Sequence, residues 1–302
     1  MNYSPEGVNP SLVKRFETVS ELKDAVDSRE IFEGAVTMCD AQHNLYIDMG
    51  NFTGLLPRLE GALGILEGTT RDIALISKVN RIVCYRVMGL HRGEKGEIVP
   101  ILSRRNVQLE CKKEYIDKLL PGDIITAKVT RPEGFGTFID IGCGINSLIP
   151  IDMLSVSRIS HTGERLYSSE IIRTALRSRE DKKLTFTLRE LLGTWEENAE
   201  NFSPGETVRG IVRSVESYGV FIELTPNLTG LADPREDLKK GQTVSVFIKS
   251  ISKSRMKIKL AVVEKFDERA KPSPLKYYTE AQHIDEWIYS PVSAGKVIYT
   301  KF

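Results

Sequence analysis

A pair of ring side chains three positions apart recurs three times along the chain, each time beside glycine or asparagine in a strand-forming run. The clear copies pair Tyr218 with Phe221 and Phe135 with Phe138, and a weaker copy pairs His43 with Tyr46. Exposed rings offer flat faces on which unpaired nucleobases stack, at roughly 1–3 kcal/mol per base. This spacing therefore indicates a surface for single-stranded nucleic acid.

The orientation of the rings depends on a glycine. Residues three apart on a regular strand point to opposite faces, so Tyr218 and Phe221 share a face only if Gly219 breaks the alternation. If Val220 faces inward, Phe221 and Glu223 are predicted to face outward. The alternative is a ring covered by a loop or by a protein partner.

Basic residues are frequent in the sequence around and after Tyr218 and Phe221. Residues 203–262 carry ten Lys and Arg against six Asp and Glu, although the net charge of the whole chain is only +1. The late basic residues are Lys249, Lys253, Arg255, Lys257 and Lys259. Such residues neutralise phosphate, although a solvated surface is an equal alternative from charge alone.

The strand-forming segments around these side chains are repeated as well. The second and third copies stay in register without a gap over Gly122–Ile141 and Gly205–Leu224. Each copy shows about five short strands with glycine at the turns, which predicts a small closed barrel. We predict a helical extension over 1–29, barrels over 30–107, 118–192 and 203–263 joined by short helical connectors, and an aromatic tail over 264–302.

Three helical segments are predicted. Thr18 and Glu21 have the spacing of a capping box and predict a helix in the extension. A second helix is predicted over Ser169–Leu176. Apolar residues at steps of three and four predict a helical connector, in which Trp195 packs between barrels. The tail is too aromatic to stay free and is predicted to pack on a barrel.

Composition narrows the class of protein. With 302 residues, 41% hydrophobic and 27% charged, the chain resembles ordinary soluble proteins. It shows no transmembrane run and no secretion signal, which predicts a cytoplasmic protein. Four scattered cysteines lack metal-ligand or disulfide spacing and are predicted to be free buried thiols: Cys39, Cys84, Cys111 and Cys143.

The three copies resemble the RNA-binding repeat of bacterial ribosomal protein S-one, over about three-quarters of the chain. The resemblance implies a five-stranded oligonucleotide-binding (OB) barrel that binds single-stranded RNA. Its stacking and basic positions fall on Tyr218, Phe221 and Lys257 in the third copy, and on Phe135, Phe138 and Arg189 in the second. With the ring and basic residues above, the predicted RNA-binding set is Tyr218, Phe221, Lys257, Lys259, Arg255, Phe135, Phe138, Arg189, His43 and Tyr46.

The chain also departs from that family. Asp233, Pro150 and Pro57 stand where the family often has a histidine, and Ser252 stands where it often has an acidic residue. An aspartate would repel phosphate at that corner. We expect the third barrel to bind best, the second moderately and the first weakly.

The leading hypothesis is a cytoplasmic protein that binds messenger RNA through several weak barrels, without cofactor, metal or membrane, and the small ribosomal subunit is its candidate partner. An accessory factor in RNA decay or transcription, or an interaction module that binds protein alone, stays open. An enzyme is least favoured. The glycines around Phe135 and the Ser250–Lys253 spacing lie in strand-like segments, and the four histidines are scattered.

Overall fold

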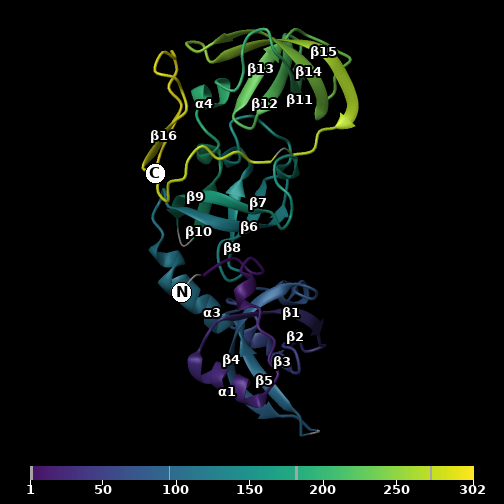
Figure 1. Ribbon diagram of the computed structural model, residues 1–302, viewed down its shortest axis with the longest axis vertical. Helices are drawn as coiled ribbons and strands as arrows, with labels where there is room; N and C mark the ends of the chain where they lie inside the picture. The colour runs from purple at the N-terminus through teal and green to yellow at the C-terminus, as the bar shows by residue number, and fades with distance from the viewer. Residues whose placement is uncertain (1–2, 95, 181–182, 273) are drawn as a thin grey trace. The chain divides into compact units, whose positions relative to one another are not determined.

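The computed structural model describes residues 3–94, 96–180, 183–272 and 274–302 (Figure 1). The other residues, which fall within the predicted extension, first two barrels and tail, lie outside this description. The chain divides into two compact units. The first comprises residues 1–119 and 140–146, and the second comprises residues 120–139 and 147–302.

The first unit holds one closed barrel with strand order β1-β2-β3-β5-β4. Its strands are β1 Phe32–Cys39, β2 Leu45–Asp48, β3 Thr53–Leu56, β4 Ile82–Arg92 and β5 Ile98–Ser103. Its α-helices are α1 Val19–Ser28, α2 Ile73–Ile76 and α3 Arg104–Glu114, and its 3-10 helices are η1 Pro10–Leu12, η2 Arg58–Glu60 and η3 Ile116–Lys118. We call this barrel one.

Two further closed barrels follow, with strand orders β10-β8-β7-β6-β9 in barrel two and β11-β12-β13-β15-β14 in barrel three. Barrel two consists of β6 Ile124–Pro132, β7 Gly136–Asp140, β8 Asn146–Pro150, β9 Ile171–Glu180 and β10 Lys183–Thr187, with η4 Ile151–Met153 and η5 Thr162–Glu164. Barrel three consists of β11 Thr207–Glu216, β12 Gly219–Thr225, β13 Leu228–Ala232, β14 Gln242–Ser252 and β15 Lys257–Arg269. The predicted fold class, three tandem five-stranded barrels of the OB type, is confirmed.

Repeated glycines let the strands of these barrels approach closely. A Cβ atom added to Gly54 in barrel one or to Gly230 in barrel three would lie 2.5 Å from a leucine methyl group, Leu102 or Leu260 respectively. A side chain at either position would therefore displace the leucine that packs there. Each barrel closes through a parallel strand pair: Leu55 with Ile101, Leu148 with Thr185, and Leu231 with Lys259.

Of the helices predicted after Thr18 and over Ser169–Leu176, the first is confirmed and the second is wrong. Thr18 and Glu21 form the predicted capping box at the start of α1. The helix predicted over Ser169–Leu176 is wrong, because these residues lead into β9, which pairs with β6 and β10. Ser169 has a φ of 70°, which a right-handed helix excludes. The β-branched Ile171 and Ile172 suit the strand that follows.

The helix α3 was not predicted. Its first turn is capped by Ser103, whose hydroxyl accepts from the backbone N–H of Asn106 at 2.9 Å. Val107 and Cys111, four residues apart, are buried on one face. The cap and this spacing were present in the sequence and are the signals that could have revealed the helix.

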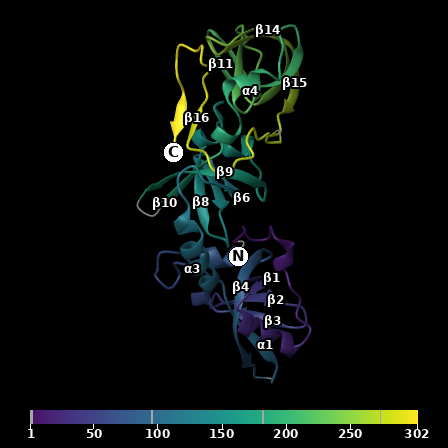
Figure 2. The same cartoon turned by 60° about the vertical axis from the view of Figure 1, so that its left-hand side comes forward.

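The connector and the tail hold the second unit together. The connector contains η6 Arg189–Leu191 and α4 Trp195–Ala199, and the tail contains the short strands β16 Glu286–Ile288 and β17 Tyr299–Lys301. Trp195 is buried in the core of barrel three with Trp287 and Tyr289 of the tail, as expected for a packing anchor. The tail, drawn in yellow, passes β9 in Figures 1 and 2. There Arg173 of β9 donates to the carbonyl of Ala281 at 2.6 Å.

Candidate nucleic-acid interface

Both clear ring pairs are assembled as predicted. The ring centroids of Tyr218 and Phe221 lie 6.1 Å apart with planes at 85°, and those of Phe135 and Phe138 lie 5.9 Å apart at 86°. This edge-to-face arrangement is a favourable one for aromatic pairs. Tyr218 is 66% exposed and Phe135 is 60% exposed, whereas Phe138 and Phe221 are half-buried. In each pair, therefore, one ring is exposed and the second ring packs against it.

In barrel three the rings share a face of the sheet with a lysine two strands away. Phe221 of β12 pairs in register with Leu231 of β13, which in turn pairs with Lys259 of β15. Lys257 and Lys259 are exposed, whereas Ile258 between them is buried, so both lysines point out of the barrel. The outer face thus carries a row of ring, aliphatic side chain and ammonium group. Such a row suits a base and its phosphate.

The aspartate that replaces the family histidine is neutralised. Lys249 donates to the Asp233 carboxylate at 2.8 Å, and this contact holds the pKa of Asp233 below its ordinary value. Lys259 lowers it further. The repulsion expected at this corner of barrel three is therefore reduced, because a lysine pairs with the carboxylate.

Barrel two obtains its cation from a different strand. At the closing pair of β8 and β10 it has Thr185 beside Leu148, where barrel three has Lys259 beside Leu231. Arg131, at the end of β6, instead lies over the Phe138 ring, 5.4 Å from its centroid. It also contacts Glu133 at 2.8 Å. Arg131 is absent from the predicted set, and its signal in the sequence was a basic residue four positions before Phe135.

Two predicted basic residues stand apart from the ring rows. Arg189 lies in η6, where its guanidinium donates to Glu190 at 3.0 Å, to the Asp152 carbonyl at 3.3 Å and to Thr300 of the tail at 3.4 Å. Arg255 is exposed in the turn between β14 and β15. Their contact with RNA stays a prediction.

Each ring of the barrel-one pair contacts one carboxylate. The hydroxyl of Tyr46 donates to Asp40 at 3.3 Å, and His43 Nδ1 lies 3.4 Å from Asp72. The bidentate contact from Arg58 holds the pKa of Asp72 below its ordinary value. Partial burial raises the pKa of Asp40, but hydrogen bonds from Asn44 outweigh it and lower that pKa. The carboxylate of Asp40 beside Tyr46 opposes phosphate, whereas Arg58 offsets the charge of Asp72.

Glu223 faces outward from barrel three, as predicted, but it does not reach solvent. It is 3% exposed and forms bidentate contacts with Arg165 of barrel two, at 2.8 and 2.9 Å, and with Arg213 of β11, at 2.8 and 3.1 Å. Arg213 also donates to Glu164 at 2.6 Å. Burial raises the pKa of Glu223, but the two guanidinium groups outweigh it and lower that pKa. We call these four residues the inter-barrel cluster.

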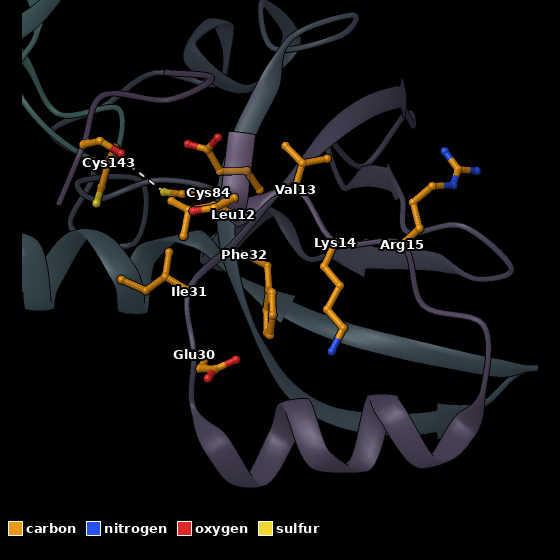
Figure 3. A pocket seen from close by; sticks show the side chains of 12 residues that line it. Leu12, Val13, Lys14, Arg15, Glu30, Ile31, Phe32, Cys84 and Cys143 are labelled. Carbon is orange, nitrogen blue, oxygen red and sulfur yellow. Dashed lines mark hydrogen bonds between the residues drawn. The ribbon is translucent and has the colours of Figure 1, made fainter. Parts of the chain in front are cut away.

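A separate pocket of about 600 Å³ lies in the first unit, lined in part by Lys14, Phe32 and Cys84 (Figure 3). Cys84 Sγ donates to the Cys143 carbonyl at 3.5 Å, and burial raises the pKa of the Cys84 thiol well above its ordinary value. A neutral thiol is a poor nucleophile, so this pocket offers little covalent chemistry. All four cysteines are free, and three are buried as predicted, while Cys39 is half-buried.

Within the described parts of the chain, no group of three or more His, Cys, Asp or Glu side chains could hold a metal ion. Among those same residues, no helix has the length and apolarity needed to cross a membrane.

No protein-family model matches the chain. It is 27% identical over 262 residues to the small ribosomal subunit protein bS1 homolog of Bacillus subtilis, an alignment that covers 81% of this chain and 65% of that protein. It is 26% identical over 291 residues to the small ribosomal subunit protein bS1 of Staphylococcus aureus, covering 89% of this chain and 71% of that protein. The chain thus spans about two thirds of the length of these relatives.

Among solved structures, a multidomain protein with nucleic acid binding domains from Streptococcus pneumoniae is 13% identical, covering 78% of this chain and 74% of the other. The TM-score of 0.26 does not show a shared arrangement. The curated relatives and the three repeated barrels carry the assignment instead. The chain is similar to small ribosomal subunit proteins of the S-one type, and it consists of three tandem barrels of the OB type.

Proposed function

We propose that the chain binds single-stranded RNA on the ring faces of barrels two and three. The observation that carries this proposal is the pairing of an open aromatic ring with an outward cation on both barrels: Tyr218 and Phe221 with Lys259, and Phe135 and Phe138 with Arg131. Rings take up bases of any sequence, and cations neutralise the backbone. Sequence preference should therefore be weak.

The names of the relatives extend the proposal. They are small ribosomal subunit proteins. We infer that the natural ligand of this chain is messenger RNA and that its role lies in translation in the cytoplasm, in association with the small ribosomal subunit. Two ring faces in one unit would raise apparent affinity, because binding at one face raises the effective concentration of RNA at the other.

Fluorescence anisotropy with labelled oligouridylate tests the proposal directly. Phe138→Ala and Phe221→Ala should each weaken binding by about 1–3 kcal/mol, because each removes one ring of a stacking pair. Phe266→Ala is a matched control, since Phe266 is an exposed phenylalanine on β15 at a position that pairs only with β14. Thermal unfolding should show that all three variants fold.

The salt dependence separates RNA binding from an apolar protein interface. RNA affinity should fall steeply as salt increases, because phosphate contacts release counterions. Duplex RNA should compete poorly, since its bases are already stacked on each other. Unchanged affinity in the Phe138→Ala and Phe221→Ala double variant would refute the proposed surface.

A further inference from the structure

A crevice of about 560 Å³ opens between barrels two and three, inside the second unit. Barrel two contributes part of the segment between β8 and β9, and barrel three contributes β11 and residues next to β14. The lining residues are Ser160, His161, Gly163, Glu164, Ile211, Arg213, Lys240, Gly241 and Ala270. This volume lies within the roughly 300–1,000 Å³ of small-ligand sites, so it is large enough for a nucleotide.

One wall of the crevice is attached to the ring pair of barrel two. Thr162, inside the lining segment, donates its hydroxyl to the carbonyl of Glu133 at 2.9 Å. A Cβ atom added to Gly134 would lie 4.0 Å from Cδ2 of His161. Glu133 and Gly134 directly precede Phe135, whose ring is open. An RNA strand with a base stacked on Phe135 would therefore pass beside the crevice.

The inter-barrel cluster fixes the width of the crevice. Arg213 belongs to the lining, and its contacts with Glu223 and Glu164 tie barrel three to the segment from barrel two. Arg165 completes the tie and also donates to Ser155 at 3.1 Å. A site already held open avoids the cost of ordering when a ligand enters.

The charge of the lining favours an anion. The inter-barrel cluster carries two charges of each sign and is neutral, so exposed Lys240 gives the crevice a positive charge. His161 Nδ1 accepts from the backbone N–H of Gly163 at 3.0 Å. The ring proton then resides on Nε2, which is left as a donor. Lysine and such a donor suit a phosphate.

We propose that RNA bound at Phe135 and Phe138 continues into this crevice, where one nucleotide is held with its phosphate near Lys240 and His161. This proposal rests on the proposed function and adds a binding site between the barrels to it. The site recognises the backbone and not the base, because its donors are a lysine, a histidine and a serine hydroxyl.

Photo-cross-linking tests the location without any substitution. Oligouridylate that carries 4-thiouridine should cross-link to the peptide containing His161 or to that containing Lys240, as well as to the peptides of the ring faces. Mass spectrometry of the digested adducts identifies them. An excess of free uridine monophosphate should compete weakly, because it lacks the neighbouring bases that stack on Phe135.

Two substitutions measure the contribution. Lys240→Glu should weaken oligouridylate binding about 5-fold and reduce the salt slope by roughly 0.7, the value for one phosphate of a single strand. His161→Ala should weaken it about 3-fold, the loss of one donor to a phosphate. Lys296→Glu, an exposed charge reversal in the tail, is the matched control and should have no effect.

The outcomes are distinguishable. If wild-type protein binds RNA but both variants bind equally well and cross-links stay on the ring faces, the crevice proposal fails alone. If strong competition by uridine monophosphate abolishes the crevice cross-links only, the site binds free nucleotides and the proposed strand path is wrong. If the wild-type protein binds no RNA, the proposed function fails and the crevice proposal fails with it.

Discussion

Barrels one and three have the same strand order and the same ring position, yet their outer faces differ in charge. Tyr46 and Phe221 both occupy the second strand and both pair across the sheet with a leucine, Leu55 and Leu231. In barrel three the row ends on Lys259, whereas in barrel one it ends on Ile101. The same barrel can therefore keep or lose the chemistry of a nucleic-acid surface through a few outward residues.

The segment between β3 and β4 explains part of the difference. In barrel one it contains α2, and Asp72 directly before this helix contacts Arg58 and His43. The corresponding segment of barrel three, between β13 and β14, brings Lys249 of β14 to Asp233. One segment directs a carboxylate at His43 of the ring pair, and the other pairs its carboxylate with a lysine of the barrel.

The largest expected effect is on stability. It concerns the acidic residue two positions after the ring of the second strand, which is Glu223 after Phe221 in barrel three and Asp48 after Tyr46 in barrel one. Glu223→Ala in barrel three should destabilise the second unit by about 3–5 kcal/mol, because Arg165 and Arg213 would be left buried together. Asp48→Ala, the same position in barrel one, should cost about 1 kcal/mol or less, since Asp48 is exposed and its contact with Arg15 is 3.5 Å long. Urea unfolding of both variants makes the comparison. Similar losses would mean that the inter-barrel cluster contributes little.

The next effect concerns RNA affinity. Phe221→Ala should weaken oligouridylate binding by about 1–3 kcal/mol, whereas Tyr46→Ala should change it less than about 2-fold, because Tyr46 lies against the Asp40 carboxylate and its row ends on Ile101 instead of a lysine. Anisotropy titrations measure both. A loss at Tyr46 as large as that at Phe221 would remove the distinction between the two faces.

A smaller effect on RNA affinity should follow from exchanging the residue that ends the outer row of each barrel, Lys259 in barrel three and Thr185 in barrel two. Lys259→Thr gives barrel three the threonine of barrel two, and Thr185→Lys gives barrel two the lysine of barrel three. The first should weaken binding about 3-fold and flatten the salt slope, and the second should do the reverse, because each changes one phosphate contact. Parallel titrations over a salt series test this. A change of the same sign in both variants would show that the row position does not set affinity.

The smallest effect depends on pH and is confined to the tail of the second unit. Hydrogen bonds to Asp123 and Asp285 raise the pKa of His283 above its ordinary 6.5. The stabilising contact is therefore complete below about pH 6.5 and is lost as pH rises through the raised pKa. Hydrogen exchange at Ile284, corrected for intrinsic rates, should be faster at higher pH.

His283→Gln supplies the control for this effect. It keeps a polar side chain but cannot titrate, so exchange at Ile284 should no longer vary with pH beyond the intrinsic rate. If wild-type protein behaves in the same way as this variant, protonated His283 does not hold the tail on barrel two.

Features that depend on short-range pattern could be predicted from the amino-acid sequence. The gapless repeat and its glycines predicted three barrels, because strand alternation and close strand approach leave local signatures. Ring spacing predicted that Tyr218 would meet Phe221. The capping box of α1 was equally visible, since both of its hydrogen bonds lie within four residues.

The tertiary structure alone decided what lies against each outward residue. The alternation of β12 makes Glu223 face outward, but only the packing of barrel two against barrel three surrounds it with Arg165 and Arg213. The wrong helix over Ser169–Leu176 has a related cause, because its strand pairs with residues about fifty positions earlier. Burial, charge pairing and strand partners depend on residues far apart in the chain, and no local pattern records them.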